Sequence, residues 1–438
     1  MFQTIRSFFA DAEPRLTLYQ SRWWFHVVLF VLATLLTISR RPDIILYPQF
    51  WAEDGTVWFE DAYNLGFWRA LFIPVVGYFQ TVSRLVGGLA QLVPLAYAPL
   101  LFNLVALAIK ILPIHFLFSS RFSAIVSNGW AKLLMALLYI GLPNTSEVFV
   151  NVTNAHSYLA LLAFMIVVAE PAKNLGWKLF DIFFISLSGL SGPFIVFLFP
   201  IALFRWWKTP DRKRLLPIML PLLLCVVIQG SSIALTGLKA RSPMALGATP
   251  ALFVKISAGQ VFLGSLIGKE GFARLYNLYL YQNDLISKFM YLAAFLIGAA
   301  TVLYTFIKAK LEIKLFIVFA GILFATALLK PMASTRESQW LVMSLPGNAT
   351  RYWFMPMLGF VVSLVWMLGK KNPLPLRMAA FVVLLVSLVG MKLEWVYYPW
   401  PDRNFKQHAE EFAKAPSGTI VEIPIMPENW HKMRLIKH

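Results

Sequence analysis

Residues 23–39 read WWFHVVLFVLATLLTIS, an apolar stretch with almost no ionisable group, which two arginines close at positions 40 and 41. Roughly 20 apolar residues cross the hydrocarbon core of a bilayer. Residues 215–235 and 290–307 have the same character. Because two tryptophans open the first stretch and no small-residue cleavage site follows it, the pattern predicts a membrane-spanning helix that stays in the mature protein, not a signal peptide.

The composition extends this reading to the whole chain of 438 residues. It is 59% hydrophobic and 14% charged, and its mean hydropathy is +0.67. A soluble domain carries about 25% charged residues, so these charges are too few to cover a water-facing surface. The 39 Lys and Arg exceed the 21 Asp and Glu. In a membrane protein this excess indicates cytoplasmic loops and contact with anionic membrane lipids, and it gives no reason to expect nucleic acid.

Apolar segments recur along the chain, and we expect an all-α polytopic membrane protein with about 11 transmembrane helices. Basic residues gather in every second loop, whereas the short turns 143–157 and 188–193 contain none, which predicts a cytoplasmic amino terminus. Segments three to six are short for a span, so some are expected to be re-entrant or buried. The segments start near Trp23, Tyr97, Trp130, Ser157, Leu179, Phe194, Leu215, Met290, Leu315, Trp353 and Met378.

This topology puts three long pieces on the extracytoplasmic side: 40–96, 236–289 and 330–352. The first is rich in aromatic residues and interrupted by Gly and Pro, which is typical of short helices that lie in the membrane interface. We therefore expect a transmembrane domain over 1–398 that includes this first outer loop, followed by a small extracytoplasmic segment over 399–438.

The carboxyl-terminal segment departs from the apolar pattern. Phe405, Ala409 and Phe412 fall on one helical face, and Asn404 is placed to cap that helix. Residues 419–425 alternate as a strand does. The pattern predicts one helix and one strand in this appendage.

An acidic motif follows the first span: residues 51–61 read WAEDGTVWFED and hold four carboxylates within nine positions. Carboxylates among aromatics at a bilayer surface are costly unless they are paired or functional. One of them can remove a proton from an attacking hydroxyl, and Asp54 is the first candidate. If the stretch is helical, Asp61 shares its face. The alternative is that Asp54 or Thr56 only caps a surface helix.

Arginines on the same side can hold a phosphate leaving group through their planar fork of donors. We expect Arg84, Arg336 and Arg351 in this role, although any one of them can instead reach lipid headgroups. No second His or Cys stands at zinc spacing from His156, so no metal or other cofactor is indicated, and a divalent metal at the acidic motif stays open. The expected residues for acceptor or sugar are Trp51, Trp58, Glu60, Asp61, Tyr78, Asn151, Asn154 and His156.

The order of parts resembles the GT-C superfamily of membrane glycosyltransferases: a cytoplasmic start, one span, an acidic first outer loop, a bundle of spans and an extracytoplasmic tail. The chain is similar in size to bacterial inner-membrane enzymes that decorate O-antigen of lipopolysaccharide or other surface glycans. The resemblance implies inverting sugar transfer from a polyprenyl-phosphate donor to a glycan or lipid-linked acceptor on the periplasmic side. It assigns the catalytic base to Asp54 or Glu53, because Glu53-Asp54 departs from the family's paired Asp-Asp or Asp-x-Asp.

Two other classes of protein fit parts of this pattern. A transporter or flippase of lipid-linked sugars also needs a lipid cavity, but it commonly has paired halves and ionisable residues near the midplane. Here Lys110 is the main charge inside an apolar segment, and no repeated halves are visible. In a non-catalytic subunit of an envelope glycan assembly machine, the carboxylates would only hold a partner.

Overall fold

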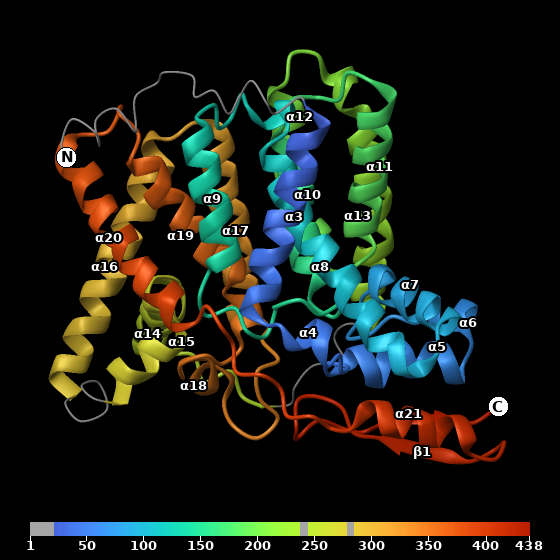
Figure 1. Cartoon of the computed structure of the whole chain (residues 1–438). Coiled ribbons are helices and arrows are strands. Elements are labelled where there is room, and N and C mark those ends of the chain that lie inside the picture. Colours follow the sequence, from blue (N-terminus) through green and yellow to red (C-terminus); the bar gives the residue numbers. More distant parts are fainter. Residues whose placement is uncertain (1–21, 237–243, 278–283) are drawn as a thin grey trace.

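The computed structural model describes residues 22–236, 244–277 and 284–438. Within these ranges, the regular structure apart from one two-stranded sheet is helical, and long helices form a bundle (Figure 1). A helix is present at each of the eleven expected segments. They are α3 (Trp23–Arg40), α8 (Ala98–Leu117), α9 (Gly129–Gly141), α10 (Ala155–Val168), α11 (Leu175–Gly189), α12 (Phe194–Lys208), α13 (Leu216–Thr236), α16 (Asp284–Lys308), α17 (Leu311–Leu329), α19 (Phe354–Met367) and α20 (Leu374–Leu393).

Within the described ranges, seven helices are long and apolar enough to cross a membrane. This confirms an all-α membrane protein. The helices at expected segments three to six have 13, 14, 15 and 15 residues, so they are as short as expected. One of the seven, Pro250–Leu275, differs from the expectation that these residues form part of the outer piece 236–289.

This additional helix consists of α14 (Pro250–Ile256), the π-helix η6 (Ser257–Leu263) and α15 (Gly264–Leu275). Gly268 breaks its backbone with φ 72°, a conformation that glycine adopts without a steric penalty. The amide of Glu270 donates to the carboxylate of Glu394, just beyond α20. Just before Pro250, Leu246 accepts from the amide of Trp340 in α18 (Gln339–Met343). The piece 236–289 is therefore a helix packed into one end of the bundle and not an open loop.

The first outer loop forms short helices, as expected, and they lie at the lower end of the bundle in Figure 1 together with α18 and the carboxyl-terminal segment. We call this end, where α3, α9, α17 and α20 finish, the site end. The helices of the first outer loop are α4 (Asp43–Leu46), the π-helix η1 (Asp54–Phe59), α5 (Glu60–Asn64), α6 (Phe67–Leu71), α7 (Thr81–Leu89), η2 (Ala90–Leu92) and η3 (Leu95–Tyr97). Three more short helices lie in other loops of the chain: η4 (Ser120–Phe122), η5 (Arg212–Leu215) and η8 (Thr350–Tyr352).

The carboxyl-terminal segment contains α21 (Phe405–Lys414) and the strand β1 (Ile420–Ile423), which pairs antiparallel with β2 (Met433–Ile436). The expected buried face of Phe405, Ala409 and Phe412 is confirmed. The expected cap at Asn404 is wrong: its backbone is left-handed, and its side chain makes no cap bond.

This segment packs on the first outer loop. The ring of Phe405 contacts that of Phe50 at 5.4 Å, and Trp400 stacks on Trp51 at 5.1 Å. Met426 exchanges backbone hydrogen bonds with the chain on both sides of Trp51. The tail therefore fixes the position of the residues that lead into the acidic motif.

Candidate functional site

A cavity of about 1250 Å³ opens at the site end. Its wall is built from the acidic motif, the loop between α9 and α10, the loop between α17 and α19, the end of α20 and the tail. Three non-glycine residues of this wall have left-handed backbones: Ala52 (φ 46°), Val76 (φ 53°) and Ala349 (φ 54°). Backbone strain of this kind concentrates at functional sites, which makes this cavity the candidate functional site.

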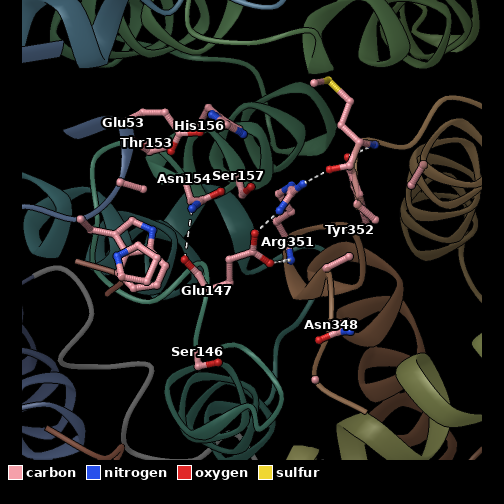
Figure 2. Close-up of a pocket in the computed structure, with 18 of the residues that line it drawn as sticks. Glu53, Ser146, Glu147, Thr153, Asn154, His156, Ser157, Asn348, Arg351 and Tyr352 are labelled. Carbon is pink, nitrogen blue, oxygen red and sulfur yellow. Dashed lines mark hydrogen bonds and ion pairs between the residues drawn. The ribbon is translucent and has the colours of Figure 1, made fainter. Parts of the chain in front are cut away.

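Glu53 is the acid of the motif that lines the cavity. The left-handed turn at Ala52 precedes it, and it is the residue from which η1 begins. Burial raises the pKa of Glu53, and the nearby carboxylate of Glu147 adds to this, whereas Arg351 opposes it. Figure 2 shows Glu53 in the same part of the pocket as Thr153 and His156. A half-buried carboxylate with a raised pKa is suited to accept a proton.

Asp54 is 1% exposed and does not line the cavity. One carboxylate oxygen accepts from the amide of Val152 at 3.1 Å, and the other accepts from the amide and hydroxyl of Thr153 at 2.8 and 2.7 Å. Burial raises the pKa of Asp54 to about 7, although the bonds from Thr153 and Val152 lower it. Its carboxylate ties the first outer loop to the loop before α10 and caps no helix of its own.

Replacing Asp54 with Ala should therefore destabilise the fold. It leaves the amides of Val152 and Thr153 without an acceptor, and a buried unsatisfied donor costs about 1–3 kcal/mol. We expect a lower midpoint of thermal unfolding for the purified protein in detergent. The control is Asp211→Ala, which removes an exposed ion pair with Arg214 at 2.8 Å, worth about 0–1 kcal/mol. Equal midpoints for the two variants would show that Asp54 does not anchor the loop.

Arg84 and Asp61 form a salt bridge at 2.6 Å, and neither lines the cavity. The Arg84 guanidinium also lies 4.9 Å from the ring centre of Trp58, so it holds the loop together. Asp54 and Asp61 have different partners, Val152 and Thr153 for the first and Arg84 for the second, and the stretch between them starts as a π-helix. Glu60 also lies outside the cavity and accepts from the amide of Arg434 in β2 at 2.7 Å.

Arg351 lines the cavity but is already paired. Its guanidinium binds the carboxylate of Glu147 and donates to the carbonyl of Met332 at 2.5 Å. The dashed lines of Figure 2 show the contact between Arg351 and Glu147. Asn154 donates to the Glu147 carbonyl at 3.1 Å and also lines the cavity, whereas Asn151, which donates to the same carbonyl at 2.7 Å, does not. These contacts of Glu147 and Arg351 hold the loop before α10 against the loop before α19 at one side of the pocket.

The remaining expected residues reach the cavity in different ways. Arg336 is exposed on its wall and has no ion pair among the described residues. The ring of His156 packs on Phe194 at 5.3 Å. Trp58 donates to the hydroxyl of Thr153 at 2.9 Å. Trp51 and Tyr78 also line the cavity.

Sequence reasoning missed Arg41, which is 5% exposed and lines the cavity. Its guanidinium lies 4.9 Å from the ring centre of Tyr397 and 4.7 Å from that of Trp400. In the part of the chain that the structure describes, no hydrogen bond or ion pair holds it, and its buried Nε has no partner. The neighbouring Arg40 is fully buried and donates to backbone carbonyls. The doubled arginine at the end of the first span was the available signal.

The cavity also has an apolar side. Phe194 and Phe197 of α12 line it together with Leu323 and Ala327 of α17 and Met355 of α19. These residues lie in helices of the bundle, whereas the charged residues of the wall, apart from Lys269 and Glu270 of α15, come from the connecting segments. The cavity can therefore hold a molecule with a polar end at the loops and a hydrocarbon part between the helices.

Within the described residues, no three His, Cys, Asp or Glu side chains gather in a way that holds a metal ion. Comparison with protein-family models and with curated proteins finds no match to this chain.

Proposed function

We propose that the protein is an inverting glycosyltransferase that moves a sugar from a polyprenyl-phosphate donor to a glycan or lipid-linked acceptor, at the extracytoplasmic face of a bacterial inner membrane. One observation carries the proposal: a carboxylate, an arginine that has no ion pair among the described residues and an apolar wall line the same cavity at one end of a membrane bundle. These are the three chemistries that a lipid-linked phosphosugar and its acceptor require.

Glu53 takes the part of general base in this proposal, in place of Asp54. An acceptor hydroxyl oxygen attacks the anomeric carbon and passes its proton to the Glu53 carboxylate. The bond between that carbon and the phosphate oxygen breaks, and its electron pair stays on the phosphate. The attack comes from the side opposite the leaving group, so the configuration inverts. Asp54 positions the motif and does not contact the reacting atoms, since its oxygens are occupied by Val152 and Thr153.

Arg41 binds the donor phosphate in this account, and Arg336 assists from the opposite loop. A guanidinium stabilises the negative charge that grows on the leaving phosphate, and it does so most strongly where water is excluded. Arg41 meets this condition because it is buried and stacked between two aromatic rings. Arg351 is less suited, since Glu147 already neutralises it.

The aromatic and apolar linings would bind the rest of the two substrates. Trp51, Tyr78 and Trp430 offer ring faces on which sugars stack. The prenyl chain would lie against Phe197, Leu323 and their neighbours on α12 and α17. A flippase remains the second candidate on chemical grounds, but Lys110, the buried charge that would support it, bonds to the hydroxyl of Tyr158 at 3.3 Å and lines no part of this cavity.

The proposal is tested by the mass of surface glycans from host cells with and without the gene. We expect glycans from cells that contain the protein to be heavier by one sugar residue per modified unit, and the increment identifies the sugar. An assembly subunit would instead change the length or amount of the glycan without changing the mass of its unit. That outcome would contradict the proposal.

A further inference from the structure

A second cavity of about 390 Å³ lies between η6, α16, α17 and α19, on the other side of α17 from the first. Leu323 and Ala327 of α17 face the first cavity, whereas Ala320 and Phe324 face the second. Its lining is almost entirely hydrocarbon, from Phe262, Phe295 and similar residues. Because it lies among helices that are long and apolar enough to cross a membrane, hydrocarbon of the bilayer is the material available to fill it.

Glycine makes the groove deep. A Cβ added at Gly321 of α17 would meet no atom within 4 Å, so the backbone there faces open space. The lining of α16 extends from Phe295 to Phe306, a length of about 16 Å at 1.5 Å per residue. This is half of the roughly 30 Å hydrocarbon core. The groove therefore matches one acyl chain of one leaflet.

Basic residues occur in the loops at one end of this groove. Phe306 and Ile317, at that end, flank the turn between α16 and α17. Residues 308–314 of this turn contain Lys308, Lys310 and Lys314 and one glutamate. The next loop adds lysines at positions 370 and 371, and it is held close because the hydroxyl of Tyr304 in α16 donates to Asn372 at 3.2 Å. This end is the one opposite the site end.

We propose that the groove binds one acyl chain of an anionic phospholipid, whose headgroup lies at the lysines of the α16–α17 turn. The apolar groove takes the chain, and each lysine near the headgroup favours an anionic lipid by about fivefold. The lipid belongs to the leaflet opposite the catalytic cavity, so it is neither donor nor acceptor of the sugar. The site is independent of the proposed transfer reaction.

The test uses the full-length protein in phosphatidylcholine vesicles that contain a trace of chain-spin-labelled lipid. Electron paramagnetic resonance measures the fraction of label that the protein immobilises. For the unaltered protein we expect at least about fivefold stronger immobilisation of phosphatidylglycerol than of phosphatidylcholine, the effect of one lysine, and a smaller difference at high salt. Equal immobilisation of the two lipids would overturn the proposal.

Variants locate the site. Gly321→Leu fills the groove and should remove the preference for phosphatidylglycerol. The matched control is Gly230→Leu in α13, where an added Cβ also meets nothing within 4 Å but which lies outside this groove. The double variant Lys308→Gln/Lys314→Gln should reduce the preference for phosphatidylglycerol, because it removes two of the lysines at this end. If Gly321→Leu and Gly230→Leu give the same preference as the unaltered protein, the groove is not the site. If Gly321→Leu does not fold, the lysine variant and the two-lipid comparison decide.

Discussion

Replacing Glu53 with Gln should reduce sugar transfer at least about 100-fold, while the protein still folds and binds its donor. Removing a positioned general base costs about 10²–10⁴ in rate, and Gln keeps the size and hydrogen bonding of the side chain but cannot accept the proton. The measurement is the fraction of surface glycan that carries the added sugar, in cells that contain equal amounts of each protein. A non-catalytic assembly subunit would tolerate the change.

The role of Glu53 as general base also predicts that the transfer rate depends on pH. Glu53 acts as a base only when ionised, so the rate should rise with pH as its carboxyl loses a proton. Because burial raises the pKa of Glu53, this rise should occur at higher pH than for an ordinary glutamate. The residual activity of Glu53→Gln should lack it. The control is Glu337→Gln, an exposed glutamate outside the cavity wall, which should keep both rate and profile. A loss of activity in this control as large as in Glu53→Gln would contradict the assignment of Glu53 as the general base.

Replacing Arg41 with Gln should weaken donor binding and slow transfer by about 10²–10³-fold, the effect of removing one donor from a developing negative charge. Arg41→Lys should restore little, since an ammonium group lacks the planar fork that stacks between Tyr397 and Trp400. The measurements are the affinity of the purified protein for polyprenyl phosphate and its transfer rate. The matched control is Arg69→Gln, an exposed arginine of α6 outside the cavity wall.

The neighbouring arginine separates a binding role from a structural one. Arg40 donates to the carbonyls of Ile140 and Glu394 and to the hydroxyl of Tyr397. Arg40→Gln leaves these buried acceptors unpaired and should lower the unfolding temperature. Arg41→Gln should unfold close to the unaltered protein, because it breaks no hydrogen bond among the described residues. If Arg41→Gln binds polyprenyl phosphate as tightly as the unaltered protein does, Arg41 does not bind the donor phosphate.

Hydropathy was enough to locate the eleven expected helices, because a bilayer requires long apolar segments whatever their packing. It missed Pro250–Leu275, in which Gly268 and the charged pair Lys269-Glu270 interrupt the apolar run. The fold of that piece depends on tertiary contacts, such as the bond between Glu270 and Glu394. A pattern along the chain does not contain such contacts.

The candidate site was harder to predict for a similar reason. Sequence identified the Glu53-Asp54 pair but not which acid lines the cavity, since that depends on a left-handed turn at Ala52, which alanine seldom adopts. Two adjacent arginines end the first span, and only their packing separates the buried Arg40 from the cavity-lining Arg41. Residue type indicates which side chains could act as a base or bind a phosphate, whereas the backbone conformation decides which of them lines the cavity.

The central claim is that the cavity removes a sugar from a lipid phosphate and does not carry the intact lipid across the membrane. The most direct measurement offers the purified protein, in sealed vesicles, a panel of labelled hexoses on polyprenyl phosphate together with a glycan extract of the host. The account predicts that label from one of the lipids appears in the glycan and that free polyprenyl phosphate accumulates in equal amount. Labelled lipid that reaches the opposite leaflet with its sugar still attached, and no labelled glycan, would contradict it.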